Sequence, residues 1–335
     1  PSLDTLVEHI LHRIVLAPWP NHEPELDTEW IDDDSMPLPL RTRLGSLRVL
    51  TQWCCVQKKA DLVPPVLKLL WILLGTGEVH RDQHIPLGVR SRLRLFAAQC
   101  ILKLATCDAY ASLILPRMGR LSYALQDECF QVRMHLLHDL LLYLMRDELP
   151  TEFHAAIFLV AFDPEDEPRV QVASYTRRLQ VLPPIVRHER LERIIVRFLH
   201  LLAHHPDLNA ESPQTLCSFA RYLEFYLACV ACETNIGVLA RFSACVRTYI
   251  DLSPSEPSVE NSRPLYAMAE LAQFLIQRLA DNHGWTIYPV DEEAPCPKDI
   301  LRSTGTIARS VLDGEVWELL QQQPRRHRDK KTKVA

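Results

Sequence analysis

Glycine is scarce in this chain, accounting for only 9 of its 335 residues. Glycine provides the positive φ angles of tight strand turns and allows the close backbone approach of phosphate-binding loops. Its scarcity therefore argues against β-rich folds and against nucleotide-binding sites. Proline is plentiful instead, with 24 residues. Frequent proline with little glycine is typical of many helices separated by stiff turns.

Recognisable catalytic motifs are also missing. The sequence contains no G-x-S-x-G, no H-E-x-x-H and no glycine-rich phosphate loop, so we expect neither enzymatic activity nor a cofactor. Its most apolar runs, such as LLHDLLLYLM and VLKLLWILLG, are too short or too charged to cross a bilayer. Without a signal peptide, we expect reduced cysteines and a cytosolic or nuclear protein. Because the chain begins at Pro1, we also expect a fragment of a longer protein.

Charge is concentrated in two segments, although the net charge is only −5. The acidic segment contains Glu23, Glu25, Asp27, Glu29, Asp32, Asp33 and Asp34. It lacks the alternating ligands and glycine of a calcium loop, which favours a solvated loop. The basic C-terminal tail contains Arg325, Arg326, Arg328, Lys330, Lys331 and Lys333. We expect this tail, from Pro324 onward, to be disordered.

Apolar residues recur every three or four positions through most of the chain, which predicts an all-α fold. The expected helices cover 1–16, 41–58, 62–75, 89–106, 109–125, 128–146, 151–161, 166–181, 189–204, 213–233, 235–251, 263–282 and 308–322. Residues 285–290 are expected to be extended. The gaps are mostly short and contain proline or aspartate, so successive helices should pair antiparallel.

This pattern predicts four regions. Residues 1–40 form an N-terminal helix and an acidic, proline-rich loop anchored by Trp19 and Trp30. Residues 41–283 form a helical-repeat solenoid. Residues 284–323 form an irregular C-terminal cap, and residues 324–335 form the basic disordered tail.

An internal repeat supports the solenoid. An apolar residue or proline followed by arginine occurs near the start of three helices, at Leu93-Arg94, Val132-Arg133 and Pro168-Arg169. From residue 93 to 132 is 39 residues, and from 132 to 168 is 36. Asp127 and Asp163 each precede the arginine by six positions. The positions eight residues after the first member of each pair are Ile101, Leu140 and Thr176.

A turn aspartate followed by an arginine in the second helix is typical of HEAT repeats, whose hairpins stack into an α-α superhelix. The aspartate can cap the helix start, and the arginine can bridge to the aspartate of a stacked neighbour. Asp127, Arg133, Asp163 and Arg169 are therefore the expected structural ladder. An irregular helical bundle remains the alternative on pattern alone.

Two clusters invite a metal or redox hypothesis. Cys229 and Cys232 form a C-x-x-C pair, but they lie inside a helical pattern with no second ligand pair, which favours a structural role. His200, His204 and His205 end an apolar helix, where the helix dipole favours histidine, and no carboxylate is evident nearby. We expect no bound metal at either cluster.

Arginines are the candidate partner-binding residues. In a solenoid, equivalent positions of successive repeats fall on one side, and their charges would form a positive ridge for an acidic segment or a DNA backbone. The alternative is that these arginines are solvated or paired internally with turn aspartates. The candidates are Arg90, Arg92, Arg94, Arg133, Arg169, Arg177 and Arg178.

Several segments resemble one known family. RLRLFAAQCILKLA, ALQDECFQVR and HLLAHHPD, with Asn261, Leu265 and Tyr266 further along, are similar in order and spacing to the cohesin-associated family named for precocious dissociation of sisters. The resemblance runs from about residue 5 to about residue 300 and corresponds to the C-terminal half of that family's HEAT solenoid. The end after residue 300 diverges.

The resemblance implies a nuclear, chromosome-associated, non-catalytic scaffold. Such a scaffold binds the kleisin subunit of the SMC ring, cooperates with a Wapl-type release factor through regions outside this chain, and supports maintenance and release of sister-chromatid cohesion. A direct contact with chromatin or DNA is a further partner interaction that we consider. The alternative is a helical-repeat transport adaptor that binds extended peptides, although the regular Trp-Asn ladder of such adaptors is missing.

Overall fold

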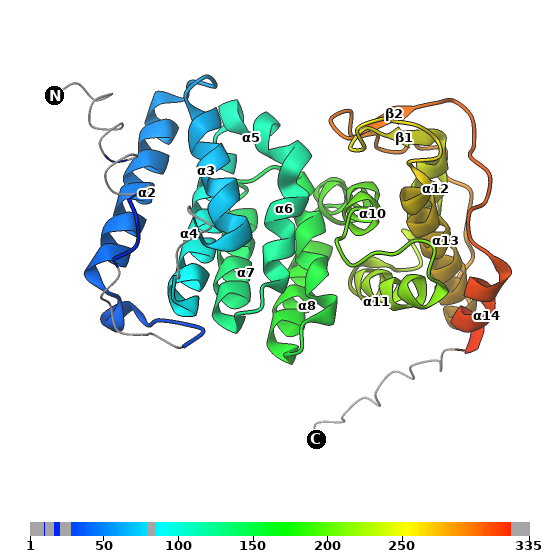
Figure 1. The fold of residues 1–335 in the computed structure, drawn as a ribbon. Helices are drawn as coiled ribbons and strands as arrows, with labels where there is room; N and C mark the ends of the chain where they lie inside the picture. Colours follow the sequence, from blue (N-terminus) through cyan, green and yellow to red (C-terminus); the bar gives the residue numbers. More distant parts are fainter. Residues whose placement is uncertain (1–9, 11–16, 21–27, 79–84, 323–335) are drawn as a thin grey trace. The chain divides into compact units, whose positions relative to one another are not determined.

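The computed structural model describes residues 10, 17–20, 28–78 and 85–322 (Figure 1). The chain divides into two compact units, residues 1–201 and residues 202–335. This boundary differs from the four regions expected from the sequence, which remain a prediction. Over the described ranges the protein is predominantly helical, so the all-α, helical-repeat class is confirmed. None of the described helices is long and apolar enough to span a membrane.

Unit 1 consists of stacked helical hairpins (Figure 1). Its longer elements are α2 (Leu38–Gln57), α3 (Val63–Thr76), α4 (Leu87–Ala105), α7 (Phe130–Met145), the 3₁₀ helix η5 (Thr151–Phe162), α8 (Asp166–Gln180) and α10 (Ile195–Ala203), which runs across the boundary between the units. Its shorter helices are η2 (Asp33–Ser35), α5 (Asp108–Ile114), η3 (Leu115–Arg117), α6 (Met118–Ser122), η4 (Tyr123–Gln126), α9 (Pro184–Arg187) and the π-helical turn η6 (His188–Glu192). Helix α4 packs against α3 and α7, and α7 packs against α8. The second helices of successive hairpins therefore lie side by side.

Local sequence explains where these elements break. The expected helix over 109–125 is interrupted at η3, because Pro116 lacks an N–H group and disfavours helical geometry in the preceding residue. Helix α3 ends at Gly77, whose φ is 70°. A Cβ on Gly77 would lie 2.6 Å from the carbonyl oxygen of Arg90. Glycine therefore permits the close return of the chain toward α4.

The two tryptophans expected to anchor the N-terminal segment do so. Trp19 is buried, and the guanidinium carbon of Arg43 lies 5.0 Å from its ring centroid. The Arg92 guanidinium lies 3.8 Å from the Trp30 ring, which also stacks on His135. Most of the expected helix 1–16, part of the acidic segment and the basic tail lie outside the described residues.

A buried polar chain ties η5 to α8. The ring Nδ1 of His154 lies 2.8 Å from the carbonyl oxygen of Thr151, and its Nε2 lies 3.0 Å from the Tyr175 hydroxyl. A carbonyl can only accept, so Nδ1 carries the hydrogen and Nε2 accepts from Tyr175. Burial lowers the pKa of His154 to about 4 and raises the pKa of Tyr175. His154 is therefore neutral at physiological pH.

Unit 2 combines helices with a small antiparallel sheet. Its elements are α11 (Pro213–Val230), α12 (Ile236–Cys245), η7 (Val246–Thr248), β1 (Tyr249–Asp251), α13 (Arg263–His283), β2 (Leu301–Ser303) and α14 (Gly314–Gln322). Helix α13 packs against α11 and α12, and α14 packs against α11. The fully buried side chains of Tyr226, Phe242 and Tyr266 are among the largest in its core.

Three expectations for this unit were wrong in detail. The helix expected over 235–251 ends at Cys245, and Tyr249–Asp251 instead pairs with Leu301–Ser303. Residues 285–290 form neither a helix nor a strand, and the last helix begins at Gly314 rather than at 308. Strands of three residues are too short to show the alternation that would identify them in the sequence.

Candidate functional site

The first candidate region is a ladder of arginine and aspartate side chains in unit 1. Arg94 on α4 reaches the turn before α7, where its Nε and Nη2 donate to the two carboxylate oxygens of Asp127 at 2.6 and 2.8 Å. The Asp127 carboxylate also accepts the backbone N–H of Cys129 at 2.9 Å. Asp127 therefore joins its own turn to the preceding hairpin.

The next rung repeats this geometry. Arg133 on α7 reaches the turn before α8, where its Nε donates to the Asp163 carboxylate at 2.8 Å. Asp163 accepts the backbone N–H of Glu165 at 2.9 Å. Arg133 also donates to the carbonyl oxygen of Asp127 at 2.8 Å, and Arg169 donates to the carbonyl oxygen of Asp163. The four expected ladder residues thus meet in one network, which Arg94 extends.

Burial makes these rungs structural. The Asp163 and Arg133 side chains are only 1% and 9% exposed. Removing one partner of such a pair strands the other charge away from water, which typically costs 3–5 kcal/mol. Thr176 occupies the repeat position equivalent to Ile101 and Leu140. Its side chain is fully buried on α8, and its hydroxyl donates to the Val172 carbonyl at 3.0 Å. This bond explains why a polar residue is tolerated there.

Most of the candidate partner-binding arginines form ion pairs within the chain. Five of the seven arginines have a carboxylate partner: Arg90 with Glu78, Arg92 with Asp33, Arg94 with Asp127, Arg133 with Asp163, and Arg169 with Asp166. Internal pairing therefore accounts for most of the positive charge of the proposed arginine ridge.

Arg177 and Arg178 differ from the other five. Both lie in the last turn of α8, and they contact a backbone carbonyl, a serine hydroxyl and the Met145 sulfur rather than a described carboxylate. No described carboxylate therefore neutralises the charges of Arg177 and Arg178. The basic tail residues, from Arg325 to Lys333, lie outside the described part of the chain.

A pocket of about 520 Å³ lies beside the first rung in unit 1. Trp71, Arg90, Arg94, Arg120 and Asp127 are among the residues that line it. Arg120 is exposed, its guanidinium lies 5.5 Å from the Trp71 ring, and no described carboxylate pairs with it. The carboxylates of Glu78, Asp127 and Glu128 also line the pocket, so it carries no net positive charge, and Arg120 beside the Trp71 ring is its one arginine without a described carboxylate partner.

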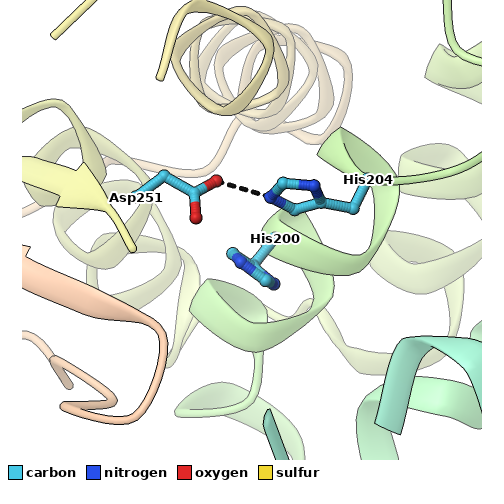
Figure 2. A group of neighbouring side chains, drawn as sticks. All are labelled: His200, His204 and Asp251. Atoms are coloured by element: carbon cyan, nitrogen blue, oxygen red, sulfur yellow. Dashed lines mark hydrogen bonds and ion pairs between the residues drawn. The ribbon is translucent and has the colours of Figure 1, made fainter. Parts of the chain in front are cut away.

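The histidine cluster has a different arrangement from the one expected. His204 follows α10, and its Nε2 lies 2.6 Å from a carboxylate oxygen of Asp251 in β1 (Figure 2). The expectation that no carboxylate lies nearby was therefore wrong. Two ligands of one tetrahedral zinc at normal bond lengths lie about 3.3 Å apart. The 2.6 Å separation is shorter than that, so the described geometry is that of a hydrogen bond between His204 and Asp251.

Asp251 also organises its own loop. The Asp251 carboxylate accepts the Ser253 N–H at 2.9 Å, while the Asp251 N–H donates to the Ser262 hydroxyl at 3.0 Å. His200, also drawn in Figure 2, lies one helical turn before His204. His205 instead packs on the rings of Phe219 and Tyr222.

The C-x-x-C pair shows a structural environment. Cys229 is buried near the end of α11, whereas Cys232 is partly exposed after the helix ends. The Cys232 N–H donates to the Asn235 side chain at 2.8 Å, and the Cys232 sulfur lies 3.2 Å from the Thr234 hydroxyl. None of the ten cysteines, all of which lie in the described ranges, forms a disulfide.

Sequence reasoning missed Glu270. This residue lies on α13, is 6% exposed, and receives the Ser310 hydroxyl at 2.8 Å and the backbone N–H groups of Val311 and Leu312, both at 3.1 Å. Arg247 lies 3.5 Å from the same carboxylate. A charged residue at an otherwise apolar helix position was the available signal, but its hydrogen-bond partners lie 40 or more residues away.

Stacked hairpins joined by this ladder define a HEAT-type helical-repeat protein. The chain belongs to the PDS5 family: a family model described as sister chromatid cohesion protein PDS5 protein matches residues 2–302. The resemblance found in the sequence is thereby confirmed.

Individual relatives agree with the family match. The chain is 24% identical over 311 residues to sister chromatid cohesion protein pds5 of Schizosaccharomyces pombe, covering 91% of this chain and 25% of that protein. It is 21% identical over 354 residues to PDS5 of Saccharomyces cerevisiae, covering 93% and 28%. PDS5 homolog A of Danio rerio is 30% identical over 202 residues, covering 56% and 15%. The chain therefore spans about a quarter of the length of its yeast relatives.

Proposed function

We propose that this chain is a non-catalytic HEAT-repeat scaffold that regulates the association of cohesin with chromosomes, in both maintenance and release of sister-chromatid cohesion. The observation that carries the proposal is the PDS5 family match over residues 2–302. The relatives that share most of this chain are named as sister chromatid cohesion proteins. The protein would accordingly act in the nucleus, on chromosomes.

The scaffold would act by binding other proteins. Its partners in this proposal are the kleisin subunit and the SMC ring of cohesin, with a Wapl-type release factor bound through regions outside this chain. Contact with chromatin is compatible with the basic tail from Arg325 to Lys333. The buried ladder suits such a role, because it fixes neighbouring hairpins and keeps their outer faces in a constant arrangement.

Affinity purification of the full-length protein, followed by quantitative mass spectrometry, tests the function. We expect the SMC subunits and the kleisin to be enriched over a mock purification from untagged cells. Enrichment of nuclear import factors and their cargoes without cohesin would instead support the transport-adaptor alternative. Failure to enrich any cohesin subunit would contradict the proposal.

A matched pair of variants tests whether the unit 1 pocket contributes. Arg120 lines the pocket and has no described carboxylate partner, whereas the exposed Arg117 lies three residues earlier and does not line it. We expect Arg120→Glu to lower kleisin recovery and Arg117→Glu to leave it unchanged, because only Arg120 lines the pocket, where it is the one arginine without a described carboxylate partner. Equal recovery with both variants would exclude this pocket while leaving the general function standing.

A further inference from the structure

A second pocket, of about 470 Å³, lies entirely within unit 2. One wall comes from residues 259–266, around the start of α13, and the other from residues 304–311, between β2 and α14. Arg247 completes the lining. A pocket of this volume falls in the range of ordinary ligand sites.

The wall formed by residues 304–311 is firmly held. The backbone N–H and the hydroxyl of Thr304 donate to the Thr248 carbonyl at 2.8 and 2.9 Å. The Ala308 N–H donates to the Arg247 carbonyl at 2.9 Å. At the far end, the buried carboxylate of Glu270 holds Ser310 and Val311. This segment is therefore preorganised, which lowers the entropic cost of binding a ligand against it.

The lining is positively charged. It contains three arginines and one glutamate: Arg247, Arg263, Arg309 and Glu260. Arg247 is compensated by Glu270 behind the wall, and Arg263 faces Glu260 at 3.5 Å, where both side chains are more than half exposed. An exposed pair of this kind contributes little and exchanges partners readily. Arg309 is exposed and has no ion-pair partner among the described residues.

The same pocket exposes two aliphatic side chains. Ile307 is 72% exposed and Val259 is 51% exposed, and they lie on opposite walls. Because more than half of each side chain is exposed, neither contributes much to the core of unit 2. Large aliphatic side chains beside an uncompensated arginine, here Arg309, are typical of surfaces that bind other proteins.

We propose that this pocket binds an acidic peptide segment of a partner protein, with carboxylates on Arg263 and Arg309 and one aliphatic side chain between Ile307 and Val259. Arginine favours this role because its planar fork binds carboxylates through paired hydrogen bonds. A nucleic-acid backbone fits less well, since it requires an extended stripe of cations and gains nothing from the aliphatic walls.

The proposal does not depend on the cohesin role. It rests on the lining of the pocket, and residues 304–311 lie beyond residue 302, where the match to the family model ends.

Fluorescence anisotropy with the full 335-residue chain tests the pocket. The probes are labelled octapeptides of glutamate with a single leucine placed at each position in turn. Three controls accompany them: peptides with glutamine for every glutamate, peptides with serine for leucine, and a labelled oligothymidylate. We expect at least one glutamate–leucine peptide to bind more tightly than all three controls, and its binding to weaken as salt is raised.

Variants locate the binding. We expect Arg309→Gln and Arg263→Gln each to weaken the best peptide by about fivefold to tenfold, the range for losing one charge-assisted contact at a surface. Glu260→Gln should strengthen it, because it removes the competing carboxylate. Arg302→Gln is the matched control, since Arg302 is exposed on β2 and does not line the pocket. Circular dichroism checks that every variant is folded.

Several results would overturn the proposal. The first is that no glutamate–leucine peptide binds more tightly than its controls. The second is that Arg302→Gln and Arg309→Gln lower the peptide affinity equally, or that Glu260→Gln lowers it. The third is that the oligothymidylate binds more tightly than any peptide. The last result would assign the pocket to nucleic acid.

Discussion

Replacing Asp163 with alanine would strand the guanidinium of Arg133 inside unit 1. The Arg133 side chain is 9% exposed, and its Nε donates to the Asp163 carboxylate at 2.8 Å. After the substitution, Arg133 would keep its bonds to the carbonyl oxygens of Asp127 and Glu128 but would have no counter-charge there. The N–H of Glu165 would also lose its acceptor.

The magnitude follows from this burial. Removing one partner of a buried ion pair costs about 3–5 kcal/mol. For a folding unit of about 200 residues, each kcal/mol lowers the melting temperature by about 2–4 °C, so we expect a decrease of roughly 6–20 °C in unit 1.

The matched control lies three residues further along the chain. The Asp166 side chain is 91% exposed and pairs with Arg169, so Asp166→Ala should cost no more than about 1 kcal/mol, the ordinary worth of an exposed pair. Because the chain has two units, a single melting curve can mix two transitions. Hydrogen-exchange mass spectrometry should therefore accompany scanning calorimetry, with faster exchange expected in α7 and α8.

Similar melting temperatures for Asp163→Ala and Asp166→Ala would refute the reasoning, because they would mean that the buried ladder carries no more stability than a surface pair. Faster exchange confined to residues 202–335 would refute it equally, since the ladder belongs to unit 1.

The remaining predictions concern acid stability, metal content and helicity. Between pH 6.5 and 4 the unfolded chain binds a proton at His154 that the folded chain excludes, so this residue should remove about 2 kcal/mol of stability by pH 5. Denaturant titrations should show a flatter pH dependence for His154→Gln, and an unchanged slope would contradict the assignment. Elemental analysis should find well under one zinc per chain, because His204 Nε2 and the Asp251 carboxylate lie 2.6 Å apart, closer than two ligands of one tetrahedral zinc; one zinc held through refolding would contradict this. Circular dichroism should show mainly helix, with strand far below the usual fifth of a globular protein.

The repeat made much of unit 1 predictable. Asp127 and Asp163 occur at equivalent turns, each six residues before an arginine, and this recurrence predicted both the hairpins and bridging between neighbours. Capping alone suggested a cost of about 1 kcal/mol for Asp127→Ala. The structure raises that expectation, because the Asp127 side chain is 8% exposed and also neutralises Arg94.

Unit 2 was less predictable because its contacts join irregular segments. Asp251 reaches His204 only because Tyr249–Asp251 forms a strand with Leu301–Ser303, about 50 residues away. Glu270 likewise binds a segment 40 residues further along. Periodicity in a single sequence reports which face of an element is buried, but it does not report which distant loop will supply a hydrogen-bond partner.

The two units solve the problem of a buried charge in different ways. In unit 1, each turn aspartate binds the arginine of the preceding hairpin and an N–H of its own turn, so one carboxylate belongs to two repeats. Breaking such a rung should loosen two neighbouring hairpins together, which makes local opening more costly than in a solenoid held by apolar contacts alone. In unit 2, the carboxylate of Glu270 instead binds a loop through Ser310, Val311 and Leu312. That arrangement fixes one wall of a pocket rather than the next repeat, so the same chemistry that extends the stack in unit 1 shapes a binding surface in unit 2.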